Sequence, residues 1–206
     1  SQAVGPAATP RTIGTASPPV GAGPWMIPRR RDDMALVRAA RSQPARLGTY
    51  GWSISTGPLV WNRHRSQFVP AGSRGARRVI WAGDISSGAV RSDPGRDALR
   101  WISIAPNQDH LVLDQPAILV QRTTAPEQPR RIVAAHLSEA DLQAAGGAVV
   151  VENHLNVLTR SADVLPGLDR LDTALLLRLL QSPVIDRLYR SMTGSVAERR
   201  NRTIGL

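Results

Sequence analysis

The fold of this chain is decided by a short apolar run that ends in polar residues, PAILVQRTT at residues 116–124. An apolar run of this length between turn residues is typical of a β-strand, and its polar end is expected to emerge from the core. Similar runs recur on both sides of it, separated by turn-rich segments such as SDPG at residues 92–95. The predicted strands are residues 78–85, 99–104, 117–123, 132–137 and 148–152, one that ends before the Gly57-Pro58 turn, and a further one at 155–160.

Both ends of the chain differ from this strand-rich middle. Residues 1–24 contain five prolines and no acidic residue, which predicts a flexible arm or linker. Residues 32–41 begin with aspartates and end with arginine, as a short helix with a favourable dipole does. After residue 169 leucines recur at helical spacing, and Ser182-Pro183 is typical of an N-cap followed by proline at the first helical position.

Strands followed by helices predict an α+β fold. We expect short, mainly antiparallel or mixed strands that form a curved sheet, followed by C-terminal helices. The predicted organisation is an arm at residues 1–24 and one domain at residues 25–206, which is β-rich to about residue 160 and helical from about residue 169. A single domain suits the length of 206 residues.

The chain is strongly basic, and all of its basic side chains other than histidine are arginines. It has 26 arginines, no lysine and 16 acidic residues, for a net charge of +10. Guanidinium groups stay charged near pH 7 and present fixed pairs of donors that match phosphate oxygens and guanine edges. This charge is the expected electrostatic signature of a nucleic-acid binder. The alternative is a solvated arginine-rich surface without a ligand.

The missing residue types exclude several chemistries. Without lysine there is no Schiff-base enzyme and no phosphate-binding loop that ends in Gly-Lys-Ser/Thr. Without cysteine there is no thiol nucleophile, disulfide or cysteine-bound metal, which fits the cytoplasm. No run of eighteen apolar residues or basic-then-apolar leader is present, so neither a membrane span nor secretion is expected.

Several motifs together resemble one family. They are STGPLVWNR at residues 55–63, PAILVQRTT at 116–124, EQPRR at 127–131, VVVENHLN at 149–156, LQSPVIDR at 180–187 and GSVA at 194–197. In this order they are similar to the C-terminal part of restriction-modification DNA adenine-N6 methyltransferases, a TaqI-like target-recognition (specificity) domain that follows the catalytic domain. The resemblance covers roughly residues 48–200. It implies sequence-specific recognition of double-stranded DNA next to a catalytic methyltransferase domain.

The catalytic half of that family has no counterpart in this sequence. Its Asn/Asp-Pro-Pro-Tyr/Phe motif, which holds the flipped adenine, does not occur here. The glycine-rich turn that holds S-adenosylmethionine has only a poor substitute in GAGP at residues 21–24. We therefore expect no catalytic residues, no cofactor and no methyl transfer in this chain alone, with S-adenosylmethionine bound by the separate catalytic domain. In bifunctional restriction enzymes of this kind a nuclease is fused as well.

The candidate DNA contacts follow from residue type and position. Asn62 to Arg65 follow an apolar strand through a Gly-Pro turn, where paired donors and acceptors are exposed for base reading. Gln121 and Arg122 end the 117–123 strand, with the alternative that they fix neighbouring loops through buried hydrogen bonds. Arginine pairs beside strands suit phosphate contact, with a solvated strand edge as the alternative. The predicted DNA-binding residues are Asn62, Arg63, His64, Arg65, Arg77, Arg78, Gln121, Arg122, Arg130 and Arg131.

The run Glu152-Asn153-His154-Leu155-Asn156 has residue types that a metal-dependent nuclease core would use. Such a core needs a second histidine or a carboxylate cluster at ligand spacing. The other histidines, His64, His110 and His136, are far away in sequence, so no metal site is expected. Two other functions stay open: a separate DNA-specificity subunit that recruits catalytic chains, and a small-molecule hydrolase with an incidental basic surface.

Overall fold

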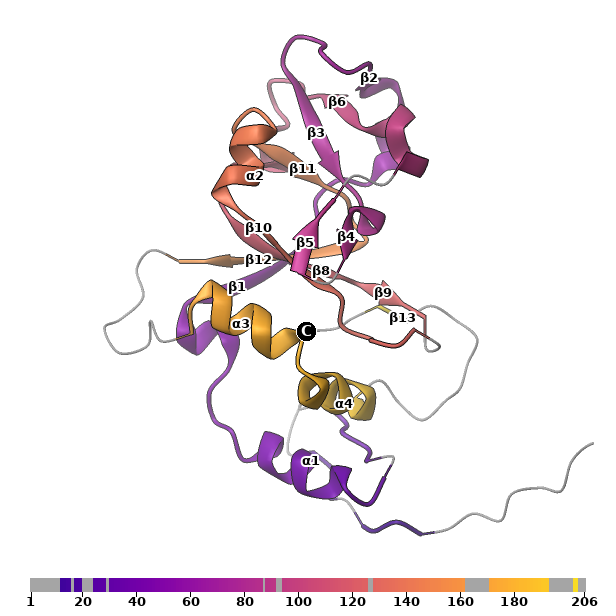
Figure 1. The fold of residues 1–206 in the computed structure, drawn as a ribbon, viewed down its shortest axis with the longest axis vertical. Helices are drawn as coiled ribbons and strands as arrows, with labels where there is room; N and C mark the ends of the chain where they lie inside the picture. The colour runs from indigo at the N-terminus through magenta and orange to yellow at the C-terminus, as the bar shows by residue number, and fades with distance from the viewer. Residues whose placement is uncertain are drawn as a thin grey trace, which may run out of the picture.

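The computed structural model describes residues 12–15, 17–19, 24–28, 30–86, 88–91, 94–125, 128–161, 171–192 and 202–203. Figure 1 shows strands in the upper and middle parts of the molecule and three of the four α-helices below them. Most of the predicted arm at residues 1–24, the start of the predicted C-terminal helical region at 169, and the motif at 194–197 fall outside the described residues.

The helices and strands have the following bounds. The α-helices are α1 (Asp33–Arg41), α2 (Glu139–Ala144), α3 (Thr173–Leu180) and α4 (Pro183–Met192). The 3-10 helices are η1 (Leu47–Tyr50), η2 (Trp61–Arg63), η3 (Arg65–Gln67), η4 (Ala82–Asp84), η5 (Pro94–Leu99) and η6 (Asp109–Leu111). The strands are β1 (Trp52–Thr56), β2 (Phe68–Val69), β3 (Ala76–Ile80), β4 (Ile85–Ser86), β5 (Gly88–Val90), β6 (Trp101–Ser103), β7 (Val112–Leu113), β8 (Ala117–Gln121), β9 (Thr123–Thr124), β10 (Ala134–Leu137), β11 (Val149–Val151), β12 (Leu155–Arg160) and β13 (Arg202–Thr203).

The strands form two mixed sheets, so the predicted α+β fold is confirmed. Within the described ranges, one sheet has the order β1-β12-β8-β10-β5-β4 and the other β2-β6-β3-β11-β7, while β13 pairs only with β9. The first sheet is antiparallel except for the β10–β5 pair, and the second except for the β11–β3 pair. The apolar part of the run at residues 116–124 forms β8, which lies inside the six-stranded sheet between β12 and β10.

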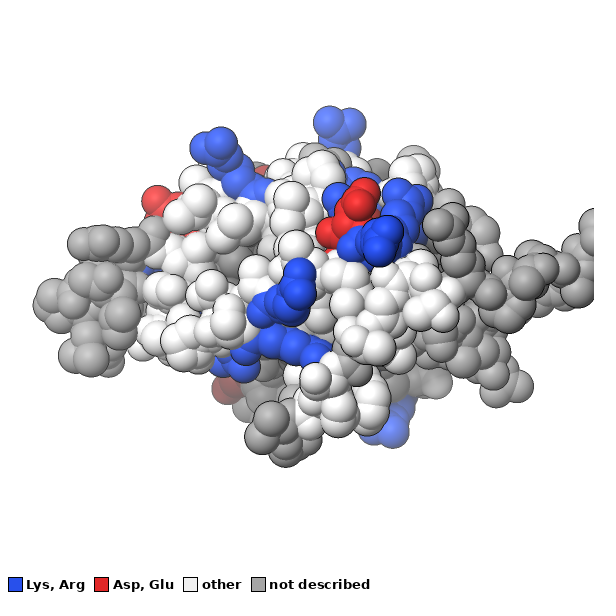
Figure 2. All heavy atoms as spheres, turned by 90° about the horizontal axis from the view of Figure 1, so that it is seen from below, with Lys and Arg blue, Asp and Glu red and all other residues white. Residues whose placement is uncertain are grey.

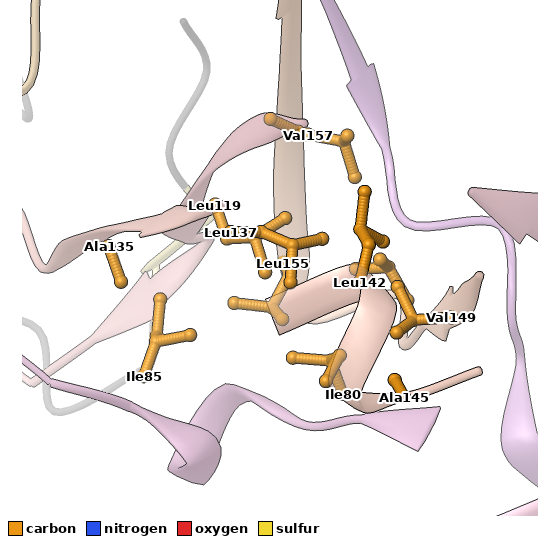
Figure 3. Packing of buried hydrophobic residues seen from close by; sticks show 12 residues of the cluster. Ile80, Ile85, Leu119, Ala135, Leu137, Leu142, Ala145, Val149, Leu155 and Val157 are labelled. Atoms are coloured by element: carbon orange, nitrogen blue, oxygen red, sulfur yellow. The ribbon is translucent and has the colours of Figure 1, made fainter. Parts of the chain in front are cut away.

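Alternation along the central strands divides the core into three clusters. Leu119 of β8 packs with Val149 and Val151 of β11 in a cluster that joins both sheets to α2 (Figure 3). On the other face of β8, Ile118 and Val120 pack against α3 and α4. Successive side chains of a strand point to opposite faces, so a single buried strand serves two clusters. This explains why β8 is apolar at consecutive positions.

The third cluster lies on the outer face of the five-stranded sheet. Val79 of β3, Val150 of β11 and Ile102 of β6 are fully or almost fully buried there. Trp81 packs on the same cluster, with Trp61 and Phe68 partly buried at its edge. The tryptophans therefore supply much of the aromatic packing of a chain with one phenylalanine and two tyrosines.

The helical end is held to the six-stranded sheet by a buried carboxylate. Asp186 of α4 accepts hydrogen bonds from the backbone N–H of Arg131 at 2.6 Å and of Ile132 at 3.2 Å. It also accepts one from Nε of Arg190 at 2.8 Å. Burial opposes ionisation of this carboxyl, but the hydrogen bonds from Arg190 and the backbone outweigh it and lower the pKa of Asp186. At the same end, Arg187 pairs with the buried carboxylate of Asp33 and so links α4 to α1.

The structure also shows what the sequence analysis did not predict. Helix α2 begins at the N-cap Ser138, whose hydroxyl accepts a hydrogen bond from the backbone N–H of Asp141 at 3.1 Å. The predicted strand at 78–85 is interrupted after Ile80, because Trp81 to Asp84 turn through η4 before β4 begins. The helices near residues 33–41, 173–180 and 183–192 lie where the sequence pattern predicted them.

Removing the Asp186 carboxylate should destabilise the fold. We expect Asp186→Ala to lower the free energy of unfolding by about 3 kcal/mol, because two buried backbone N–H groups and Arg190 lose their acceptor. Since the pKa of Asp186 is lower in the folded than in the unfolded chain, its stabilisation is present above about pH 4 and is lost as the pH falls further. Urea unfolding of Asp186→Asn across this range should therefore show a flatter acid limb than the unsubstituted chain. An identical acid limb would contradict this role.

Candidate nucleic-acid interface

A pocket of about 320 Å³ opens where β3 and β11 end. Its walls come from four separate segments of the chain: η2, the Trp81–η4 turn, η5, and the turn between β11 and β12. The lining residues are Trp61, Trp81, Ala82, Gly83, Arg96, Glu152 and His154. Because β3 and β11 run parallel, the residues that follow both strands meet at the same edge of the sheet.

The turn between β11 and β12 is built around Glu152, which is 1% exposed. Its carboxylate accepts two hydrogen bonds from His154: one from the backbone N–H at 2.9 Å and one from Nδ1 of the imidazole at 2.5 Å. The His154 side chain is 58% exposed. A buried carboxylate on Nδ1 favours the proton there and fixes the orientation of the ring, so Nε2 keeps its own hydrogen-bonding capacity.

The segment at residues 57–60, which links β1 to the predicted loop at Asn62 to Arg65, packs against this turn. A bridge joins Leu59 to Glu152, and the Leu59 carbonyl accepts a hydrogen bond from the Asn153 N–H at 3.0 Å. Gly57 comes still closer, because a Cβ at this position would lie 2.3 Å from the Glu152 carbonyl oxygen. Glycine is therefore required here by space, which is one reason why the chain has the Gly57-Pro58 turn.

Two arginines stack on the two tryptophans that border the pocket. The guanidinium of Arg65 lies 4.7 Å from the Trp61 ring centroid, and the guanidinium of Arg96 lies 4.8 Å from the Trp81 ring centroid. The two indoles meet edge to face, with ring centroids 6.3 Å apart. Cations in this position are attracted by the ring quadrupole and lose part of their freedom. Among the described residues, neither guanidinium has a hydrogen-bond partner.

Two ion pairs of Arg100, a buried one with Asp84 and one with the exposed Asp97, hold the segments that carry Trp81 and Arg96. Asp84 accepts hydrogen bonds from the Trp81 backbone N–H at 2.9 Å and from Arg100 at 2.7 Å. Arg100 also binds Asp97 of η5 at 3.1 Å. Burial alone would lower the pKa of Arg100, but the hydrogen bonds and charges of Asp84 and Asp97 raise it. The Arg100 guanidinium therefore stays charged and ties η4 and η5 together.

Gln121 and Arg122 lie at the same edge and bind the backbone of the pocket. Nε2 of Gln121 donates to the Ala82 carbonyl at 2.8 Å, and Nη1 of Arg122 donates to the Asn153 carbonyl at 2.7 Å. The Arg122 backbone N–H also donates to the His154 carbonyl at 2.9 Å. These bonds match the alternative in which Gln121 and Arg122 fix neighbouring loops. Contact with DNA by their remaining polar atoms stays a prediction.

The 62–65 segment continues the rim of the pocket through η2 and η3. Asn62, Arg63 and Arg65 are exposed, and their side chains have no hydrogen-bond partner among the described residues. His64 instead bonds through Nδ1 to the side-chain oxygen of Gln67 at 2.6 Å. Asn62, Arg63 and Arg65 are therefore presented to solvent, while His64 holds the turn between the two 3-10 helices.

The remaining predicted residues lie elsewhere. Arg77 and Arg78 belong to β3, with Arg77 near the end remote from Trp81, where its Nη1 donates to the Gly146 carbonyl at 3.2 Å. Arg131 is 6% exposed; its Nε donates to the Thr124 hydroxyl at 3.0 Å and its guanidinium lies 5.9 Å from the Tyr189 ring centroid. Arg130 borders a different, mainly apolar pocket next to Gln181. The structure thus brings together six of the ten predicted residues and leaves four outside the group.

The helical end carries basic side chains without forming one continuous basic surface. Figure 2 shows this end, where arginines are separated by uncharged surface and some lie beside an acidic side chain. The ion pairs Arg187–Asp33 and Arg190–Asp186 account for part of this arrangement. The pocket edge offers three exposed guanidiniums without a described acidic partner, those of Arg63, Arg65 and Arg96.

Sequence reasoning did not select Trp61, Trp81 or Arg96 for the site. Trp61 directly precedes Asn62 in the quoted STGPLVWNR motif, so an exposed loop that begins with an indole was the available signal. No local pattern marks Arg96, whose role depends on the Asp84–Arg100 and Arg100–Asp97 pairs. No group of three or more histidine or acidic side chains among the described residues is arranged to hold a metal ion.

No protein-family model matches this chain, and no curated protein does. In the described part of the chain, none of the helices combines the length and the apolar character that crossing a bilayer requires.

Gly57→Ala tests the close approach that shapes the pocket. We expect this substitution to lower the free energy of unfolding by about 2 kcal/mol, because its Cβ meets backbone atoms that cannot rotate away. Gly48→Ala is the matched control, since a Cβ there meets nothing within 4 Å. Urea unfolding followed by tryptophan fluorescence measures both variants. Equal stability of the two would show that the segment at Gly57 shifts without cost.

Proposed function

We propose that this chain is the target-recognition domain of a site-specific DNA adenine-N6 methyltransferase. The carrying observation is the row of exposed guanidiniums of Arg63, Arg65 and Arg96, which lies beside a pocket fixed by buried carboxylates. The family resemblance of the sequence motifs supports the same assignment. The partners are double-stranded DNA in the cytoplasm and a catalytic methyltransferase domain that binds S-adenosylmethionine.

The geometry suits duplex binding because these cations are held in place by the protein. Arg65 and Arg96 are stacked on indoles, so less side-chain freedom is lost when they bind phosphate. Asn62 and Arg63 carry the paired donors and acceptors that read adenine and guanine edges in the major groove. We therefore assign Arg65 and Arg96 to the DNA backbone and Asn62 and Arg63 to the bases.

DNA binding by this chain should depend steeply on salt. Each neutralised phosphate contributes about 0.9 to the slope of log affinity against log salt concentration. Arg65→Ala combined with Arg96→Ala should therefore reduce the magnitude of this slope by about 1.8, measured by fluorescence anisotropy with a labelled duplex. Arg178→Ala, an exposed arginine of α3, is the charge-matched control and should leave the slope unchanged. Absence of duplex binding in dilute buffer would refute the proposed function.

Arg63 should determine preference at one base position. We expect Arg63→Ala to lose about 1–3 kcal/mol of discrimination there, because a bidentate contact to guanine is removed. Selection of duplexes from a randomised library by each variant would show one relaxed position. Arg130→Ala, a predicted phosphate contact at the helical end, should weaken all duplexes nearly equally. Uniform weakening by Arg63→Ala would assign Arg63 to the backbone instead.

A further inference from the structure

We infer that the pocket between Trp61, Trp81, Arg96 and His154 binds one unpaired nucleotide of a DNA strand. This inference rests on the proposed function, because it takes DNA as the ligand. It adds a site for a single base to the surface proposed to contact a duplex. It is carried by three kinds of wall within one pocket of about 320 Å³: aromatic, cationic and hydrogen-bonding.

The aromatic wall consists of indoles whose positions are fixed by the core. Trp81 is 3% exposed, stacks on Phe68 with centroids 6.2 Å apart, and donates from Nε1 to the Leu99 carbonyl at 3.1 Å. Trp61 is only partly buried and forms an edge-to-face pair with Trp81. A flat, rigid and partly exposed indole is a platform on which any nucleobase can stack.

The cationic wall is the guanidinium of Arg96. It lies on the Trp81 ring, and no described residue accepts a hydrogen bond from it. Stacking leaves the N–H groups at the edge of the guanidinium free for an anion, because the contact with the ring uses its face. Arg65, stacked on the other indole, and the neighbouring Arg63 extend this positive charge beyond the pocket. Cations inside and outside the pocket suit a ligand that continues as an anionic chain.

The hydrogen-bonding wall is the imidazole of His154. Glu152 occupies its Nδ1 and holds the ring in place, so that Nε2 accepts a hydrogen bond when the ring is neutral and donates one when it is protonated. The exocyclic amines and ring nitrogens of a base offer partners of both kinds. The Glu152 carboxylate cannot move toward a ligand without releasing the turn that it holds.

A nucleotide has one part for each of these walls. Its planar base matches the indole of Trp61, the polar edge of the base matches His154, and its phosphate matches Arg96. The pocket volume lies at the lower end of the range of about 300–1,000 Å³ for small-molecule sites, which suits one nucleotide rather than two. A duplex cannot place a paired base in such a pocket, so the base must be extruded or belong to a single strand.

The test compares two labelled single-stranded pentanucleotides that differ only in the central residue, which is either adenosine or an abasic sugar. Both carry the same phosphates, so the ratio of their affinities isolates the base. We expect the base-containing strand to bind about 5- to 150-fold more tightly. Trp61→Leu should reduce this ratio to near one, because the side chain stays apolar while the aromatic face is lost, and Trp61→Phe should retain most of it. Circular dichroism melting confirms that each variant is folded.

Arg96→Ala separates the phosphate from the base. It should weaken both pentanucleotides by a similar factor and leave their ratio almost unchanged, while the control Arg178→Ala should change neither. Equal affinity of the two strands for the unsubstituted chain, or an unchanged ratio in folded Trp61→Leu, would overturn the inference.

The source of the unpaired base is distinguished with 2-aminopurine, whose fluorescence depends on stacking. A change on binding of both a single strand and a duplex that carry the probe indicates extrusion from the duplex, whereas a change in the single strand alone indicates a single-stranded ligand. Duplex binding with the expected salt slope but equal affinity for the two pentanucleotides would refute only the pocket inference. Absence of binding to any DNA would refute the proposed function as well.

Discussion

The arrangement of the candidate interface depends on one junction, where the chain passes from the five-stranded to the six-stranded sheet through the buried Glu152. Strand β11 belongs to one sheet and β12 to the other, and only the turn at Glu152 to His154 separates them. The segment after β1 also passes from the six-stranded sheet to this junction. Strand β1 pairs with β12, and Leu59, three residues after β1, is bridged to Glu152. A buried carboxylate is costly unless it is hydrogen-bonded, and Glu152 meets this condition within its own turn. The pocket therefore opens at a place where the hydrogen bonds of Glu152 and the Leu59 bridge hold the backbone.

The arginines of this protein have two different uses, which the net charge of +10 does not distinguish. Arg100, Arg122 and Arg131 bind carboxylates, carbonyls or hydroxyls of the protein itself. Their donors hold segments of the protein together. Lysine would be less suitable for this role, because it lacks a planar set of donors. Arg63, Arg65 and Arg96 are exposed and have no hydrogen-bond partner among the described residues. Among the described exposed arginines, Arg65 and Arg96 are distinguished by lying on tryptophan rings.

Local sequence patterns predicted much of the fold but only part of the candidate site. Alternation and apolar runs identified β8, β11 and β12, and capping and helical spacing identified α1, α3 and α4, because these signals act over a few neighbouring residues. The same reasoning found Asn62 to Arg65, which follow a strand and a turn. It could not place Arg96 beside Trp81, because that contact depends on tertiary pairing of η5 with η4 through Arg100. Nor could it separate Arg131 from Arg130, since only the packing of α4 explains why one of two adjacent arginines is buried.

The junction also explains why the residues proposed to read and anchor DNA lie on 3-10 turns instead of long helices. A short turn has few internal hydrogen bonds, so its position must come from contacts with the scaffold. Here η2 follows the Leu59 bridge, η4 is capped by the buried Asp84, and η5 is tied to it by Arg100. Each turn is thus fixed by contacts with the scaffold, and its exposed side chains can differ without disturbing the core. Under the proposed function, a surface that must suit different DNA sequences needs this separation between a fixed backbone and replaceable side chains.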